Sequence, residues 1–501
     1  MLKKLWAYLS AAAVSVALLG SLPASAAYVE ANTYTRSLSV SDVSVVQDYL
    51  TAKSSTVNPM ADLNQDGCID AVDLALHKQI LLGNLELLEP PAEMRDLTAK
   101  QLLSEITIGW NLGNTLDATT TSWLPNPTPA QSETAWNCPI TTKEMIDKVK
   151  EGGFNTVRVP VSWIDHTGSA PDYQIQEEWM NRVQEVVNYV IDNDMYCILN
   201  IHHENDWLIP TYAQKDSVNA RLAALWTQIA NRFGNYDEHL IFEGMNEPRL
   251  VGDPNEWNGG TAEARQVINS YNQTFVNTVR ATGGNNAIRC LMVPTYAAAC
   301  SSTTVNDFVL PTDTVPNKLI VSIHSYSPYN FALNKDGTSS FTQSDIGQLQ
   351  WTIQEIYNSF VGKGTPVIIG EFGAMNKNNI NDRVLWGENY IRIAKSYGIP
   401  CVWWDNNAFN TTGENFGLLN RDNVSWEYPE LLQALMKGLQ GYLHITKKGV
   451  PGLSSFFTSA VRKRILFQPL VEKNGKSTSL TIQISEKIRP RLVFLVFLPE
   501  I

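Results

Sequence analysis

Cysteine is scarce in this sequence. The 501-residue chain has six cysteines, at positions 68, 138, 197, 290, 300 and 401, and none belongs to a CxxC pair. This spacing excludes the usual zinc ligand patterns and a dense disulfide framework, although one or two bridges stay open. Cys197, Cys290 and Cys401 fall inside apolar runs, so we expect them to be small buried hydrophobic residues.

Positive charge is also in deficit. The chain has 38 Lys and Arg against 50 Asp and Glu, a net charge of −12, which argues against nucleic acid as a partner. The deficit is uneven, because residues 441–501 alone carry ten Lys and Arg and three Asp and Glu, or +7. We therefore interpret residues 441–501 as a basic tail outside the main domain, of a nature that its composition does not reveal.

Long hydrophobic runs are limited to the N-terminus. Lys3 and Lys4 precede an apolar run at residues 5–19, and residues 24–26 (Ala-Ser-Ala) offer a small-residue cleavage site. The run is shorter than the ~20 residues of a spanning helix, so a membrane anchor is the weaker alternative. Residues 1–26 are predicted to be a signal peptide, and the protein is predicted to be secreted and extracellular, with no membrane span.

The apolar content is high enough for a large folded core. Hydrophobic residues make up 44% of the chain and aromatic residues 10%, which excludes global disorder. We expect a small module at residues 32–84, a linker at 85–95 stiffened by two prolines, a catalytic domain at 96–440 and the basic tail.

Residues 62–73 have the pattern of a calcium-binding loop. Oxygen ligands are expected from Asp62, Asn64, Asp66, Asp70 and Asp73, together with the backbone carbonyl of Cys68. Gly67 occupies the sixth position of the loop, where a sharp turn is needed. The loop resembles that of dockerin modules, small all-α EF-hand-like pairs of loop and helix that tether enzymes to a cohesin on a scaffold protein. The resemblance implies a structural Ca²⁺, a cohesin partner and attachment to a cellulosome or cell surface.

A dockerin has two repeats, and the first is degenerate here. Asp42 aligns with Asp73 at a spacing of 31 residues, and a helix is predicted at residues 43–50. The other ligand positions hold Ala31, Thr33 and Thr35, and Arg36 replaces the glycine. We therefore expect a single calcium site.

From residue 96 the chain alternates apolar β-prone runs with helical patterns. Strands are predicted at residues 106–110, 156–159, 196–201, 240–243, 287–293, 319–323, 367–370 and 401–404. Helices are predicted at residues 142–152, 177–193, 218–233, 262–281, 382–397 and 426–438. Eight such units indicate an α/β fold, a (β/α)8 TIM barrel. An open doubly wound sheet is the rival, but the turn at residues 109–113 lacks its glycine-rich phosphate motif.

Polar and aromatic residues gather at the ends of these strands. They are Asn111, Arg158, His202, His203, Asn246, Glu247, His324, Tyr326, Glu371 and Trp404. In a barrel, all of these positions meet at the rim that carries active sites. Glu247 and Glu371 each end an apolar strand, and paired carboxyl groups are typical of glycosidic bond cleavage.

Seven segments in order carry a family resemblance. They read GWNLGNTLDA, FNTVRVPVSW, ILNIHHE, FEGMNEP, IHSYSP, IIGEFGA and VWWDNN. From about residue 97 to 439 the chain resembles the cellulases of glycoside hydrolase family 5. The resemblance implies a retaining endo-1,4-β-glucanase that acts on β-glucan polysaccharide without a cofactor for catalysis. Xyloglucanase, xylanase and mannanase activities on the same scaffold stay open, as does a non-catalytic glycan-binding subunit.

The resemblance also implies roles for the site residues. Glu247 matches the general acid/base and Glu371 the nucleophile, with the two carboxyl groups ~5–5.5 Å apart. His202, His203 and His324 match substrate-binding and acid-orienting histidines, and which of His202 and His203 faces the substrate stays open.

Elementary electrostatics supports these roles. We expect Arg158 and Tyr326 to keep Glu371 ionised, and the charge of Glu371 to raise the pKa of Glu247. Asn246 suits the sugar 2-hydroxyl, and Trp404 offers its face to a sugar ring. Glu243, inside its strand, is expected to be the buried partner of a barrel arginine.

Overall fold

The computed structural model describes residues 29–30, 35, 38–63, 68–82, 87–88, 94–120, 122–440, 466–469 and 480–483. The chain divides into two units, Met1–Gly441 and Tyr442–Ile501. In the second unit, strands β13 (Leu466–Pro469) and β14 (Leu480–Gln483) form an antiparallel pair. The predicted signal peptide at residues 1–26 lies outside the described residues, as does most of the linker at 85–95 and of the tail at 441–501.

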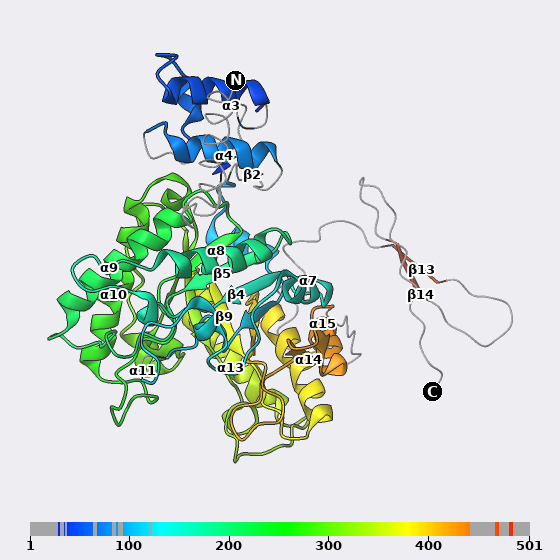
Figure 1. Cartoon of the computed structure of the whole chain (residues 1–501). Helices are drawn as coiled ribbons and strands as arrows, with labels where there is room; N and C mark the ends of the chain where they lie inside the picture. The colour runs from blue at the N-terminus through cyan, green and yellow to red at the C-terminus, as the bar shows by residue number, and fades with distance from the viewer. Residues whose placement is uncertain are drawn as a thin grey trace. The chain divides into compact units, whose positions relative to one another are not determined.

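Eight parallel strands of the first unit close into a barrel, as the sequence predicts (Figure 1). In barrel order they are β3 (Gly109–Leu112), β4 (Thr156–Val159), β5 (Tyr196–Asn200), β6 (Leu240–Glu243), β7 (Leu291–Pro294), β8 (Leu319–His324), β9 (Val367–Phe372) and β10 (Cys401–Asp405). β10 pairs with both β9 and β3, so the sheet has no free edge.

Helices surround the barrel (Figure 1). They include α7 (Lys143–Glu151), α8 (Glu177–Ile191), α9 (Lys215–Arg232), α10 (Ala262–Ala281), α11 (Ser302–Asn306), α13 (Ile346–Ser359), α14 (Ile380–Ser396) and α15 (Pro429–Gly438). None of the helices in the described part of the chain is long and apolar enough to cross a membrane.

Side chains alternate across the barrel wall, as the two-residue period of a strand requires. Outward residues such as Val157, Leu199 and Phe242 belong to the large core shared with the helices. Inward residues such as Ile198 and Ile241 form a second cluster with helix α5 (Ala99–Glu105). The N-terminal half of the barrel interior is thus filled with apolar side chains.

Two predicted strands begin later in the structure than in the sequence prediction. Ile106 packs in the cluster with α5, and β3 starts at Gly109, where a Cβ would lie 2.9 Å from Val402 Cγ1. Residues 284–287 form a 3-10 turn instead of opening β7. Arg289, which follows this turn, is buried, and its side chain donates to backbone carbonyls, including Leu240 O at 2.8 Å. These side-chain hydrogen bonds differ from the backbone pairing of a strand.

The N-terminal helices α3 (Val40–Leu50) and α4 (Ala71–Leu81) begin with the same capping box. Ser39 pairs with Asp42 in one, and Asp70 pairs with Asp73 in the other. Asp73 is fully buried, and its Oδ1 accepts a hydrogen bond of 2.7 Å from Leu63 N at the start of the predicted calcium loop. Asn64, Asp66 and Gly67 lie outside the described residues, so the calcium site stays a prediction.

Candidate active site

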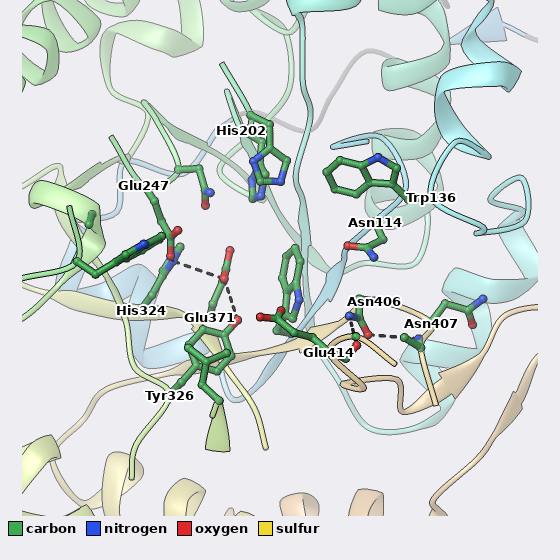
Figure 2. Close-up of a pocket in the computed structure, with 18 of the residues that line it drawn as sticks. Asn114, Trp136, His202, Glu247, His324, Tyr326, Glu371, Asn406, Asn407 and Glu414 are labelled. Atoms are coloured by element: carbon green, nitrogen blue, oxygen red, sulfur yellow. Dashed lines mark hydrogen bonds and ion pairs between the residues drawn. The ribbon is translucent and has the colours of Figure 1, made fainter. Parts of the chain in front are cut away.

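A cleft of about 1400 Å³ opens at the carboxyl ends of the barrel strands (Figure 2). Eight of the residues expected at this rim line it: His202, His203, Asn246, Glu247, His324, Tyr326, Glu371 and Trp404. Asn111 and Arg158 are fully buried and lie outside this lining set, so they support the site from below.

Glu247 and Glu371 face each other across His324 (Figure 2). His324 Nδ1 lies 2.7 Å from Glu247 Oε1 and 3.5 Å from Glu371 Oε2. One carboxylate oxygen from each glutamate and a ring nitrogen of His324 all lie within 4.8 Å of one another. The two carboxyl groups are therefore close enough for both to reach one glycosidic carbon and its leaving oxygen.

Glu371 is held by two donors. Arg158 Nη1 lies 2.9 Å from its Oε1, and the Tyr326 hydroxyl donates to its Oε2 at 2.9 Å. Both contacts are those expected from the sequence. Arg158 also donates to Asn111 Oδ1 at 3.0 Å and to Asn246 Oδ1 at 2.7 Å, so one guanidinium fixes three neighbours at the rim.

Glu243 is a buried partner of Arg158, as expected, and faces the barrel interior. Its Oε2 accepts from Arg158 Nε at 2.7 Å and from Asn200 Nδ2 at 3.0 Å. Its Oε1 accepts from the Ser322 hydroxyl at 2.6 Å. Because the carboxylate is fully buried and both its oxygens accept hydrogen bonds, the role of Glu243 is to position Arg158.

Burial is the largest influence on both rim carboxyl groups, and by itself it raises each pKa. In Glu247 the hydrogen bond and charge of His324 and the charge of Arg249 outweigh burial, so the pKa is lowered. In Glu371 burial, together with the charge of Glu247, outweighs His324 and Arg158, so the pKa is raised.

These two pKa directions are the reverse of those expected from the sequence, which were a raised pKa for Glu247 and an ionised Glu371. The expectation left out the proton of His324. Burial disfavours the charged form of His324, but Glu371 and Glu247 outweigh that effect and raise its pKa. His324 Nδ1 lies nearer to Glu247 Oε1, at 2.7 Å, than to Glu371 Oε2, at 3.5 Å, so its influence is stronger on Glu247.

His202 and His203 both line the cleft. The His202 ring is stacked parallel to the Trp404 ring, with centroids 5.9 Å apart, and Asn200 holds its Nδ1 at 3.1 Å. The His203 ring lies 5.4 Å from that of Trp136. Trp404 fits against the β3 loop because Gly113 has no Cβ, which would lie 2.8 Å from the indole.

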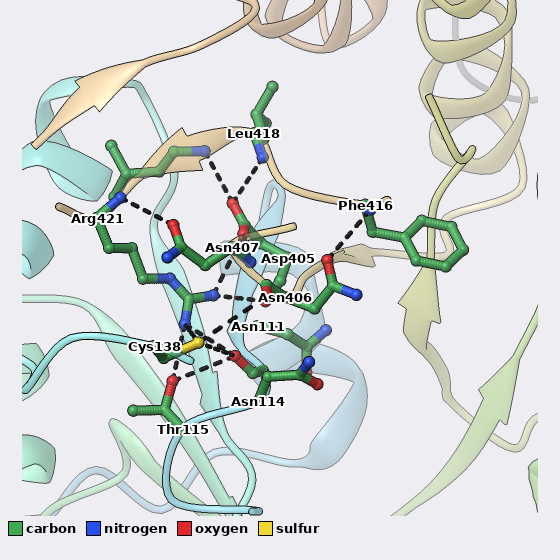
Figure 3. A network of polar contacts seen from close by, with 12 residues as sticks. Asn111, Asn114, Thr115, Cys138, Asp405, Asn406, Asn407, Phe416, Leu418 and Arg421 are labelled. Carbon is green, nitrogen blue, oxygen red and sulfur yellow. Dashed lines mark hydrogen bonds and ion pairs between the residues drawn. The ribbon is translucent and has the colours of Figure 1, made fainter. Parts of the chain in front are cut away.

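The loop between β10 and α15 builds one wall of the cleft and is anchored by Asp405 and Arg421 (Figure 3). Asp405 Oδ2 accepts from Leu418 N and from the Trp110 indole at 3.0 and 2.9 Å. Arg421 Nη1 donates to Gly113 O at 2.8 Å, and Nη2 lies 3.2 Å from Asp405 Oδ1. This buried ion pair ties the loop to β3.

Several cleft residues are absent from the sequence-based site. They are Asn114, Asn137, Asn258, Tyr329, Asn406, Asn407, Thr411, Thr412 and Glu414. Tyr329 begins the short helix α12 (Tyr329–Ala332), and the others sit in loops, where no strand pattern marks them, although Asn406 and Asn407 directly follow β10. Among the tryptophans outside the barrel strands, Trp136 and Trp257 line the cavity, whereas Trp163 is fully buried.

Comparisons with known proteins agree with the geometry. Residues 117–410 match the family Cellulase (glycosyl hydrolase family 5). Endoglucanase B of Neocallimastix patriciarum is 50% identical over 347 residues, which cover 69% of this chain and 73% of that protein. The cellulase/esterase CelE of Acetivibrio thermocellus is 53% identical over 347 residues, but the chain spans 41% of its length.

A solved structure is closer in sequence than these two proteins. It is a broad specificity endoglucanase from Ruminococcus champanellensis with bound cellotriose, 87% identical, with a TM-score of 0.69. The match covers 69% of this chain and 100% of that chain.

Proposed function

The chain belongs to glycosyl hydrolase family 5, and from that premise we propose that it is a retaining endo-β-1,4-glucanase acting on cellulose and related β-glucans. The observation that carries the proposal is the pair Glu247 and Glu371, whose nearest carboxylate oxygens lie within 4.8 Å at the rim of the barrel. Such a close pair suits double displacement, because an inverting site needs room for a water molecule. The cellotriose in the Ruminococcus champanellensis structure supports a β-glucan substrate.

The first step forms a glycosyl ester. A Glu371 carboxylate oxygen attacks the anomeric carbon, the bond from that carbon to the glycosidic oxygen breaks, and the proton of Glu247 moves to the leaving oxygen. In the second step water attacks the anomeric carbon, the ester bond to Glu371 breaks, and the proton of water passes to Glu247. Two inversions retain the configuration.

His324 Nδ1 and Glu247 Oε1 are 2.7 Å apart, and the proton of this hydrogen bond can be carried by either atom. The reactive form carries that proton on Glu247 and leaves His324 neutral. Neutral His324 with protonated Glu247 holds the same number of protons as charged His324 with ionised Glu247. The lowered pKa of Glu247 is therefore compatible with an acid role.

Glu371 attacks as the ionised group, held by Arg158 and Tyr326. Asn246, fixed by Arg158, offers its amide to the sugar 2-hydroxyl, and Trp404 offers its ring face to the sugar. The chemistry uses only carboxyl groups and water, so the proposal includes no cofactor.

Product analysis tests this function. The chain is incubated with carboxymethylcellulose, lichenan, xyloglucan, xylan and mannan, and viscosity is measured alongside reducing ends. We expect a rapid fall in viscosity on the β-1,4-glucans, and Glu371→Gln as a near-isosteric control abolishes it. Hydrolysis of xylan or mannan alone would refute the glucanase assignment. Binding of glucan without cleavage by the unmodified chain would support the non-catalytic alternative.

A dockerin-like role for residues 32–84, with one Ca²⁺ in the loop at 62–73 and a cohesin partner, is part of the same proposal. Helices α3 and α4 each begin with a capping box that has an aspartate at N3, and the two boxes lie 31 residues apart in sequence, which supports two repeats of one unit. Secretion follows from the N-terminal segment at residues 1–26 and is tested by N-terminal sequencing of protein recovered from culture medium.

A further inference from the structure

Glu414 is a third carboxyl group in the cleft, besides Glu247 and Glu371. Figure 2 shows its side chain beside Glu371 and Tyr326, and it belongs to the wall that the loop between β10 and α15 builds. The residue is exposed to the solvent that fills the cleft. Among the described residues that line the cleft there is neither lysine nor arginine, so these three glutamates are its permanent source of charge.

The loop holds Glu414 in place through its backbone. Asn406 Nδ2 donates to the backbone oxygen of Glu414 at 2.9 Å, and Asn376 N donates to the backbone oxygen of Asn415 at 2.8 Å. Phe416 is fully buried, and its N donates to Asn406 Oδ1 at 3.1 Å. Because these contacts fix the loop without the Glu414 carboxyl group, that group is free to face a bound chain.

Glu414 also differs from the two reacting glutamates in its charge balance. Arg158 Nη1 lies 2.9 Å from Glu371 Oε1, and Arg249 Nη1 lies 3.9 Å from Glu247 Oε2. No cation in the described part of the chain plays this part for Glu414: partial burial in the cleft and the charges of Glu371 and Glu247 all raise its pKa. The wall at Glu414 therefore presents a negative charge that the protein leaves uncompensated.

An uncompensated carboxylate in a cleft distinguishes substrates by their charge. The hydroxyl groups of an uncharged glucan can donate hydrogen bonds to it. A glucan whose hydroxyl groups carry carboxylates instead brings a like charge to the wall. Two like charges about 4 Å apart weaken binding about fivefold even at the dielectric constant of water. Repulsion of this kind is a common source of specificity.

We propose that Glu414 is a specificity-determining residue that selects uncharged β-glucans and disfavours β-glucans that carry carboxylate groups. The inference rests on the proposed function, since it takes the pair Glu247 and Glu371 as the place of cleavage. Glu414 takes no part in the bond-breaking steps. It decides which chains lie beside the pair.

The test compares two soluble derivatives of cellulose that are matched in chain length and in degree of substitution. Carboxymethylcellulose carries anionic groups, and hydroxyethylcellulose carries uncharged ones. The readout is the ratio of kcat/KM on the first polymer to kcat/KM on the second, measured from reducing ends at neutral pH and low salt. For Glu414→Gln, which removes the charge and keeps the shape, we expect this ratio to rise about fivefold. Glu414→Asp keeps the charge and stays near the wild-type ratio.

Salt provides a second readout that a merely structural role would not move. Raising the ionic strength from about 0.01 M to about 1 M shortens the screening length from about 30 Å to about 3 Å. The wild-type ratio then rises to meet that of Glu414→Gln, because the repulsion is screened. A gap between the two proteins that persists unchanged at high salt contradicts a charge effect.

Glu355→Gln is the matched control, because Glu355 is exposed on helix α13 and lies outside the set of residues lining the cleft. It removes the same charge from the protein and leaves the ratio at the wild-type value. A ratio for Glu414→Gln within about twofold of wild type overturns the proposal, as does an equal rise in Glu355→Gln. Failure of the proposed function itself is distinguishable, because the unmodified chain would then cleave neither polymer.

Discussion

Substitution of Tyr326 is the most direct test of how Glu371 is kept ionised. Its hydroxyl donates to Glu371 Oε2 at 2.9 Å, and Arg158 occupies the other oxygen. Tyr326→Phe removes this single donor and keeps the ring, which packs 5.3 Å from Phe416. Because the hydrogen bond favours the ionised carboxylate, its loss raises the pKa of Glu371.

The magnitude follows from the burial of the pair. A hydrogen bond to a buried charged group contributes about 1.5–3 kcal/mol. At about 1.4 kcal/mol for each pKa unit, the pKa of Glu371 rises by about one to two units. The acidic limb of the pH profile, which requires ionised Glu371, moves up by the same amount.

The assay is kcat/KM on β-cellobiosyl fluoride measured across the pH range. Tyr390→Phe is the control, since the buried Tyr390 hydroxyl donates to the backbone oxygen of Ser325 at 2.8 Å instead of to a carboxylate. It lowers stability and leaves the acidic limb in place. An acidic limb that stays fixed or moves down in Tyr326→Phe would refute the reasoning.

Three further predictions address stability and metal binding. Glu243→Gln removes the negative charge that pairs with Arg158 Nε at 2.7 Å inside the barrel, so the free energy of unfolding in urea falls by about 3 kcal/mol, whereas the exposed Glu355→Gln changes it by less than about 0.5 kcal/mol. Burial raises the pKa of Glu204 from 4.5 to about 7. The stability of the neutral form is therefore lost as the pH rises through this window, and Glu204→Gln flattens the curve of unfolding free energy against pH. Calorimetric titration with Ca²⁺ gives one site, in the loop at residues 62–73, and two equivalent sites would contradict the degenerate first repeat.

The barrel was predictable because its strands are buried on both faces and read as continuous apolar runs. Helix α10 was predicted with the bounds that the structure shows, since its apolar residues recur with helical period. Helix α13 was missed, although Leu349, Ile353 and Ile356 have helical spacing. The start of β7 was wrong because Arg289 turns inward to backbone carbonyls, a tertiary contact that local pattern does not reveal.

In the candidate site, too, residues placed by strand pattern were predicted and residues placed by tertiary contacts were not. Residues at strand ends were found because strand pattern places them on one rim. Trp257, Asn114 and Glu414 depend on how loops fold back over the rim, which periodicity does not encode. The pKa order of the carboxyl pair was wrong because it depends on one proton of His324, 2.7 Å from one group and 3.5 Å from the other.

The central claim is the division of roles between Glu371 and Glu247, and azide rescue tests it most directly. Glu371→Ala and Glu247→Ala are each incubated with an activated β-cellobioside and sodium azide, and the product configuration is read by proton NMR. We expect α-cellobiosyl azide from Glu371→Ala, because azide replaces the nucleophile in one inversion, and β-cellobiosyl azide from Glu247→Ala, because the ester on Glu371 still forms. A β-azide from Glu371→Ala, or an α-azide from Glu247→Ala, would contradict it.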